Sequence, residues 1–131
     1  KDELTVFLGN TKLTFLKYTF PVILPFTDYE GVKLLNPKEI GATKAYTIGR
    51  RGNFKDYIDL YFILSKRRSS LSEVLDLSEK KYKDEFNSRL FLEQLVYLED
   101  VAEEDLLFLK DKVGRKQLER FFVDEIKQLT L

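Results

Sequence analysis

The sequence lacks cysteine and histidine, two residue types that carry much of enzyme chemistry. Without cysteine the chain has no disulfide, thiolate metal site or cysteine nucleophile. Without histidine it has no imidazole metal ligand, Ser-His triad or histidine general base. Any metal bound by these residues must therefore have carboxylate, hydroxyl or carbonyl ligands, which suit Mg²⁺ or Mn²⁺.

An excess of one charge is also missing, since 22 lysines and arginines balance 22 aspartates and glutamates. A net charge of zero gives no overall attraction to nucleic acid or anionic membrane, so such a contact must come from a local patch. No apolar run approaches the ~20 residues of a membrane span, and no signal peptide is visible, so we expect no membrane contact and a cytoplasmic protein. The chain begins with Lys1 and has no methionine, which we interpret as a processed piece or a fragment.

The apolar content suffices for one folded unit. The 131 residues are 44% hydrophobic and 14% aromatic, which argues against disorder. A chain of this length forms one compact core, and it shows no internal repeat, low-complexity tract or linker. We therefore expect residues 1–131 to form a single unit.

The first quarter of the chain has strand-like composition. Leu4–Leu8 and Lys12–Phe20 are rich in β-branched and aromatic residues, and Gly9-Asn10 between them is a hairpin signal. Pro21 ends the second run because proline donates no ladder hydrogen bond. Gly31–Leu35 is a candidate third strand. The pattern predicts a short antiparallel segment over residues 1–35.

Helix signals follow from Asn36 onward. Asn36 is a suitable N-cap with Pro37 in the first turn, and Glu39 makes the start resemble a capping box. Gly49–Gly52 is predicted to break this helix, and Asn53 to cap a second one that runs to about Lys66.

Three further helices are expected. Ser70 with Glu73 predicts a capping box, Asn87 or Ser88 begins the next helix, and Gly114 precedes the last one. The predicted fold class is therefore α+β, with a short antiparallel strand segment followed by a bundle of about five helices over residues 36–131.

Lys44 is the first candidate site residue. It lies on an apolar helix face, one turn from both Ile40 and Ile48. A buried charge costs free energy unless it is paired or bound. One interpretation is a phosphate contact, because lysine is a mobile cation with three donors. The alternative is a surface lysine with a buried stem, or a structural ion pair.

Asp56 and Asp59 are the second candidates. They are three residues apart, so both carboxylates project from one helical face, beside a nearly unbroken apolar run. They can orient a substrate or hold Lys44 or Arg51. Alternatively, Asp56 stabilises the helix N-terminus and Asp59 makes a buried ion pair.

The run Gly49–Gly52, together with Lys55, forms a basic turn that leads into a helix start. Both features favour anions. Such turns are common on ordinary surfaces, and the interest of this one comes from its proximity to Lys44.

The segment from Asn36 to Leu64 resembles the AbiEii/AbiGii-type toxin nucleotidyltransferase family. In that family a lysine is followed by an arginine about seven residues on, and then by a basic residue and Asp-x-x-Asp-Leu at the start of an apolar helix. The corresponding residues here are Lys44, Arg51, Lys55, Asp56, Asp59 and Leu60. The resemblance extends forward through Thr11–Pro21, which is similar to the last core strand of the family, and more loosely through the helical tail.

The resemblance implies that residues 1–35 form the strand-rich edge of a nucleotidyltransferase-like core and residues 36–131 a helical subdomain. It implies binding of a nucleoside triphosphate for nucleotidyl transfer to an RNA or protein acceptor, and a cognate antitoxin protein as partner. Asp56 and Asp59 are the implied catalytic residues, with Asp59 positioning Lys44 and Asp56 orienting the substrate or Arg51. Lys44, Arg51 and Lys55 are the implied substrate-binding residues.

Mg²⁺ is the cofactor that the resemblance implies, with ligands mostly outside this chain. The family places a Gly-Ser turn and an Asp-x-Asp pair before this region, and neither is present in the sequence. A third carboxylate of the family often lies on the strand where this chain has Thr14. These 131 residues alone are therefore expected to be inactive, because they cannot clamp two divalent ions.

Two other functions remain open at this point. The first is a non-catalytic helical protein-interaction module on the same scaffold, which Thr14 and the balanced charge favour. The second is an RNA-binding module built on the basic turn, whose signature is strong salt dependence.

Overall fold

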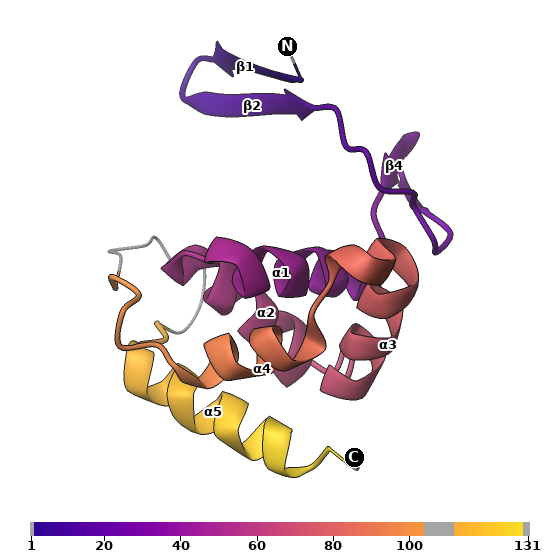
Figure 1. The fold of residues 1–131 in the computed structure, drawn as a ribbon. Coiled ribbons are helices and arrows are strands. Elements are labelled where there is room, and N and C mark those ends of the chain that lie inside the picture. The colour runs from indigo at the N-terminus through magenta and orange to yellow at the C-terminus, as the bar shows by residue number, and fades with distance from the viewer. Residues whose placement is uncertain (1, 104–111, 130–131) are drawn as a thin grey trace.

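The computed structural model describes residues 2–103 and 112–129; residue 1 and the parts 104–111 and 130–131 of the predicted helical range lie outside them. Two antiparallel strand pairs are followed by five α-helices in these residues, which confirms the predicted α+β class (Figure 1). The strands are β1 Glu3–Leu8, β2 Thr11–Leu16, β3 Thr27–Tyr29 and β4 Val32–Leu34. The helices are α1 Pro37–Arg51, α2 Phe54–Ser65, α3 Leu71–Tyr82, α4 Ser88–Val96 and α5 Arg115–Lys127, with a 3₁₀ turn, η1, at Lys83–Glu85.

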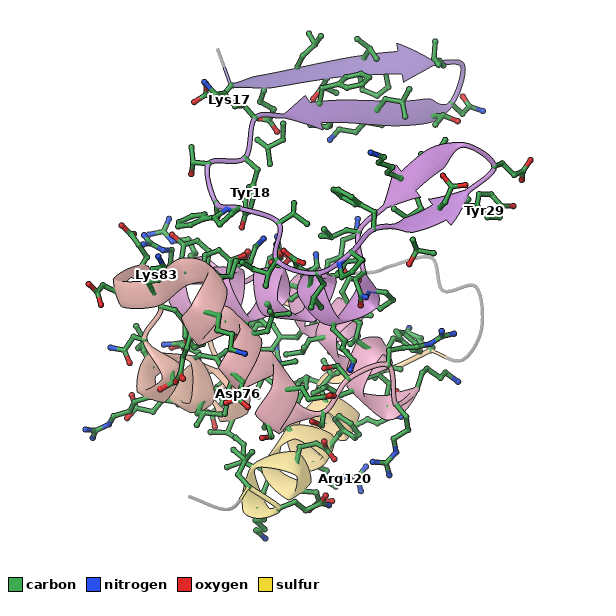
Figure 2. The ribbon with its side chains drawn as sticks, turned by 90° about the vertical axis from the view of Figure 1, so that its right-hand side faces the viewer. Lys17, Tyr18, Tyr29, Asp76, Lys83 and Arg120 are labelled. Carbon is green, nitrogen blue, oxygen red and sulfur yellow. The ribbon has the colours of Figure 1, made fainter. Side chains whose placement is uncertain are left out.

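The predicted hairpin is present. β1 pairs with β2 in antiparallel register, with Val6 opposite Leu13, and Gly9 in the turn has a φ of 61°. The prediction that the second strand reaches Phe20 is wrong, because β2 ends at Leu16. Beyond it the chain turns toward the helices, and Figure 2 shows Tyr18 on this part of the chain. The Tyr18 hydroxyl lies 2.7 Å from that of Tyr82.

One face of this hairpin is apolar and exposed. Cross-strand partners share a face, so the register gathers apolar side chains on one side. Leu4, Leu8 and Phe15 on that side are 59–65% exposed. The hairpin stands apart from the helices (Figure 1). An isolated two-stranded hairpin is marginally stable in water, so this face is suited to packing against further structure.

The candidate strand at Gly31–Leu35 is confirmed as β4, but it does not join the first hairpin. It pairs with β3, which the sequence pattern did not predict, in a separate two-stranded sheet. Glu30 and Gly31 form the turn between them, with φ values of 50° and 83°.

Most of the residues predicted to begin helices are N-caps in the structure. Asn36, Asn53, Ser70 and Asn87 accept hydrogen bonds from the first turns of α1, α2, α3 and α4, and Ser70 with Glu73 forms the predicted capping box. Two local predictions are wrong. Gly49 lies within α1, which ends only at Arg51, so Gly49–Arg51 is helix rather than a turn. Glu39 is not part of a capping box, because a longer-range partner, described below, takes its carboxylate.

The helices share one apolar core. Its most buried side chains come from all five helices, and none is more than 2% exposed. They include Ile48, Phe54, Val74, Phe91 and Phe122. A second, smaller cluster around Ala42, Leu77 and Tyr82 packs against Phe20 and Leu24 of the segment that leads from the strands. This cluster fixes the strand segment to the helical body.

Candidate functional site

Lys44 on α1 meets both aspartates of α2. Its Nζ lies 2.8 Å from Asp59 Oδ2 and 3.2 Å from Asp56 Oδ1. The structure thus brings together the lysine and the two carboxylates that the sequence singled out. One cation faces two anions at this point, and the site carries a net negative charge before any other group is counted.

The short connection between α1 and α2 creates this geometry. Only Gly52 and Asn53 separate the helices. A Cβ at Gly52 would lie 2.9 Å from the Ile48 Cα, so glycine permits the close turn. Asn53 caps α2 by accepting from the Asp56 N–H, and Asp56 Oδ2 accepts in return from the Asn53 N–H. This capping box fixes the Asp56 carboxylate while its other oxygen contacts Lys44.

Electrostatics keep Lys44 charged. Its side chain is 22% exposed, against 14% for Asp56 and 37% for Asp59. Burial lowers the pKa of the Lys44 ammonium, but the hydrogen bond and charge of Asp59, followed by those of Asp56, outweigh burial and raise this pKa above its ordinary value. Burial, together with the charge of the Asp56 carboxylate, also raises the pKa of Tyr57 to about 12. Lys44 is therefore a fixed cation at neutral pH.

Arg51 and Lys55 lie near this cluster in sequence but are placed differently. Arg51 is the last residue of α1, Lys55 lies in the first turn of α2, and both side chains are exposed. Within residues 2–103 and 112–129 the structure records no ion pair between either residue and the two aspartates. Their substrate-binding roles stay predictions, as do the catalytic roles of Asp56 and Asp59.

The cluster does not fit a divalent metal ion. No group of three or more potential metal-ligating side chains occurs among the described residues. Asp56 and Asp59 already share the Lys44 ammonium, which would repel a divalent cation at the same place. Thr14, at the position where the family often has a carboxylate, contacts the Thr5 hydroxyl at 3.0 Å instead. We therefore assign no Mg²⁺ ligand and no metal-dependent step to these residues.

Sequence reasoning missed a second buried ion pair. Lys81 Nζ lies 2.6 Å from Glu39 Oε2, and the side chains are 1% and 0% exposed. The signal was available for Lys81, which follows Val74 by seven residues on the apolar face of α3, the same pattern that identified Lys44. No local pattern indicates its partner, because Glu39 lies 42 residues away.

Comparison with known proteins places these observations in a family. Residues 3–129 match the model described as "Nucleotidyl transferase AbiEii toxin, Type IV TA system". The chain belongs to the AbiEii nucleotidyl transferase toxin family. An uncharacterized protein of Aquifex aeolicus (strain VF5) is 31% identical over 130 residues, which make up 98% of this chain and 62% of that protein. The chain thus spans less than two thirds of the length of this relative, and no solved structure matches the chain.

Among the residues that the structure describes, no helix is both long enough and apolar enough to cross a membrane.

Proposed function

We propose that this chain supplies the helical half of a nucleotide cleft in an AbiEii-type nucleotidyltransferase, and an edge of its catalytic sheet. In this role Lys44 and Arg51 contact the phosphates of a nucleoside triphosphate. The reaction transfers the nucleotidyl group to a hydroxyl of an RNA or protein acceptor and releases pyrophosphate. The observation that carries the proposal is the Lys44 ammonium held between Asp56 and Asp59 on the residues that carry the family motif.

The aspartates act as positioning residues in this proposal. Asp59 makes the shorter contact to Lys44, and Asp56 is itself fixed by the capping box with Asn53. Catalysis of phosphoryl transfer depends on positioning and on charge stabilisation, so a lysine held in one place is more effective than a mobile one. Arg51, at the end of the same helix, is exposed and can approach the phosphates from the side.

The strand segment supports a role as a sheet edge. The apolar face of the β1–β2 hairpin is exposed, and the Aquifex relative is longer than the matched region. A core domain that extends the hairpin into a larger sheet and packs a further layer on this face would cover it and supply the Mg²⁺ ligands that the described residues do not provide. A cognate antitoxin protein and a cytoplasmic location belong to the same proposal, since the family is one of toxin–antitoxin systems.

Nucleotide titration tests the assigned roles. The complete protein encoded by the reading frame is titrated with each nucleoside triphosphate in the presence of Mg²⁺, followed by Lys44→Ala and Asp59→Asn. We expect at least about tenfold weaker binding for Lys44→Ala, because one charge-assisted phosphate contact is lost. Lys112→Ala, an exposed lysine on another part of the chain, is the matched control. Unchanged affinity in both Lys44→Ala and Asp59→Asn contradicts the roles.

A second candidate is a non-catalytic protein-interaction module on the same scaffold. Thr14 favours it, because its hydroxyl contacts Thr5 where a metal-binding carboxylate is expected in an active enzyme. A complete protein that binds no nucleoside triphosphate but retains its protein partner would identify this function.

A further inference from the structure

A pocket of about 370 Å³ lies between α1, η1 and the start of α4. It does not belong to the Lys44 cluster. Tyr46, which lines it, follows Lys44 by two residues, so their side chains leave α1 about 200° apart. We propose that this pocket binds a nucleobase.

Tyr46 and Arg50, which line the pocket from α1, belong to a stack of planar groups that continues to Tyr82 of α3, outside the pocket lining. The Tyr46 ring lies 4.1 Å from that of Tyr82 at an interplanar angle of 12°. The guanidinium of Arg50 lies 4.7 Å from the centre of the Tyr46 ring. Because Tyr82 covers one face of Tyr46, Arg50 covers the other. Guanidinium planes and aromatic rings at the end of such a stack are surfaces on which nucleobases pack.

The pocket rim provides both donors and acceptors. Arg50 Nη2 donates to Glu85 Oε1 at 2.9 Å. Neither side chain makes another hydrogen bond within residues 2–103 and 112–129, so the second carboxylate oxygen and the remaining guanidinium N–H groups are available to a ligand. The side-chain oxygen of Asn87 accepts from the Leu90 N–H, and its amide nitrogen has no hydrogen-bond partner among the described residues. A base presents both donors and acceptors along its edges, so this rim complements it.

Apolar surface completes the pocket. Phe86 and the 40% exposed Leu90 line it, and Gly49 leaves its α1 wall without a side chain. A Cβ at Gly49 would lie 3.6 Å from Phe91, so α1 and α4 pack closely beside the pocket. Figure 1 shows these two helices side by side. The volume falls in the range of small-ligand pockets and suits one heteroaromatic ring with its sugar.

The turn that forms one wall holds a strained residue. Lys83, at the start of η1, has a φ of 52° and a ψ of −125°, which L-residues rarely adopt. Figure 2 shows Lys83 on the outer side of this turn, at the end of α3. Glu85 and Phe86, which line the pocket, follow Lys83 by two and three residues.

The bound base can belong to a free nucleotide or to a single strand of RNA. The experiment distinguishes these sources and is independent of the proposed function. Isotope-labelled protein is titrated with adenosine and cytidine, which carry no phosphate for the Lys44 cluster to recognise. It is then titrated with a single-stranded oligoadenylate RNA and with an RNA duplex of equal length.

We expect the backbone amide resonances of Gly49, Arg50 and Asn87 to shift with nucleosides and with the single strand. Leu90→Trp fills the pocket and Arg50→Gln removes the end of the stack, so each should weaken binding by about fivefold or more. Lys38→Gln is the matched control, because Lys38 pairs with Glu73 at 3.0 Å in a similarly exposed ion pair from α1. It should change affinity by less than about twofold.

The relative affinities for the single strand and the nucleosides distinguish the two sources of the base. A single strand that binds more tightly than the nucleosides identifies RNA as the source, and equal binding identifies a free nucleotide. The proposal is overturned if neither probe shifts these resonances, if the duplex shifts them as strongly as the single strand, or if Leu90→Trp and Arg50→Gln both bind like the control. Since Leu90 and Arg50 are exposed, both variants should fold.

Discussion

The ammonium of Lys81 donates to the carboxylate of Glu39 at 2.6 Å in a nearly solvent-free environment. Glu39 also accepts from the backbone N–H groups of Ile23 and Leu24, both at 2.8 Å, and Lys81 donates to the Pro21 carbonyl at 2.6 Å. One ion pair therefore ties the segment that follows the β1–β2 hairpin to both α1 and α3. It satisfies polar backbone groups that neither helix nor sheet provides for.

Breaking this ion pair from one side should be costly. We expect Glu39→Gln to reduce the free energy of unfolding by about 3–5 kcal/mol, because Lys81 is left as a buried and poorly compensated charge. Lys81→Met should have a similar effect. The double variant should cost less than the sum of the two, by about 0.5–3 kcal/mol. Urea denaturation measures all three.

The control for this double-mutant cycle is Lys38→Met, which removes an exposed ion pair made from α1, the helix of Glu39. It should reduce the free energy of unfolding by less than about 1 kcal/mol. Additive costs at Glu39 and Lys81 would show that the two side chains do not depend on each other.

The Glu39 carboxylate should make the free energy of unfolding depend on pH in the acid range. Burial raises the pKa of Glu39, but the hydrogen bond from Lys81 and those from the Leu24 and Ile23 N–H groups hold it below the ordinary value of 4.5. The unfolded chain then binds more protons than the folded one. The stabilisation is complete above pH 4.5 and is lost as pH falls through the folded pKa.

Unfolding measured between pH 7 and pH 3 tests this expectation. The free-energy difference between the parent protein and Glu39→Gln should narrow as the solution becomes more acidic. A difference that stays constant across this range would contradict the assignment.

Removing Lys44 should destabilise the protein less than removing Glu39. Lys44→Met leaves the carboxylates of Asp56 and Asp59 facing each other, but solvent screens them because all three side chains are partly exposed. We expect a loss of about 1 kcal/mol in low salt and a smaller loss in 1 M salt. Thermal melts at two salt concentrations measure it. The matched control is Lys55→Met. Lys55 is an exposed lysine on α2, one turn before Asp59, and its replacement should have little effect on the melting temperature.

Replacing Lys83 with glycine should stabilise the protein. The positive φ of Lys83 has a cost for residues with a Cβ that glycine avoids. After the larger entropy of the unfolded glycine chain is subtracted, we expect a net gain of about 0.5–1 kcal/mol. Lys80→Gly, within α3 and equally exposed, should instead lose about 1 kcal/mol. A Lys83→Gly melting temperature at or below that of the parent would show that the turn is not strained.

The helix positions were predictable because their signals are local. Asn53 and Ser70 each bind a backbone N–H three residues ahead, so their capping role can be recognised within one turn of sequence. The meeting of Lys44 with Asp56 and Asp59 was predictable for a related reason. Two connecting residues join α1 to α2, so the spacing along the chain strongly restricts the spacing between the helices.

Other features were not predictable, because residues far apart in the sequence compete with local partners. Glu39 has the position of a capping-box residue, yet the buried ammonium of Lys81 is a stronger partner than a solvated backbone N–H. The strand predicted to reach Phe20 ends at Leu16 because Tyr18 and Phe20 pack against Tyr82. β3 is as short as β4, but its three residues, Thr27–Tyr29, include no aliphatic residue of the kind that marked β4 as a candidate strand.

By itself, the sequence determined which chemistry is absent, where the helices begin, and which family motif the chain carries, since composition and capping act over a few residues. Tertiary structure alone decided that Glu39 pairs with Lys81, that the hairpin exposes its apolar face, and that Tyr46 and Arg50 border a pocket. The physical reason is that burial and long-range ion pairs depend on which helix faces pack together. Helical periodicity shows that a face is buried, but it does not identify the residue on the other side.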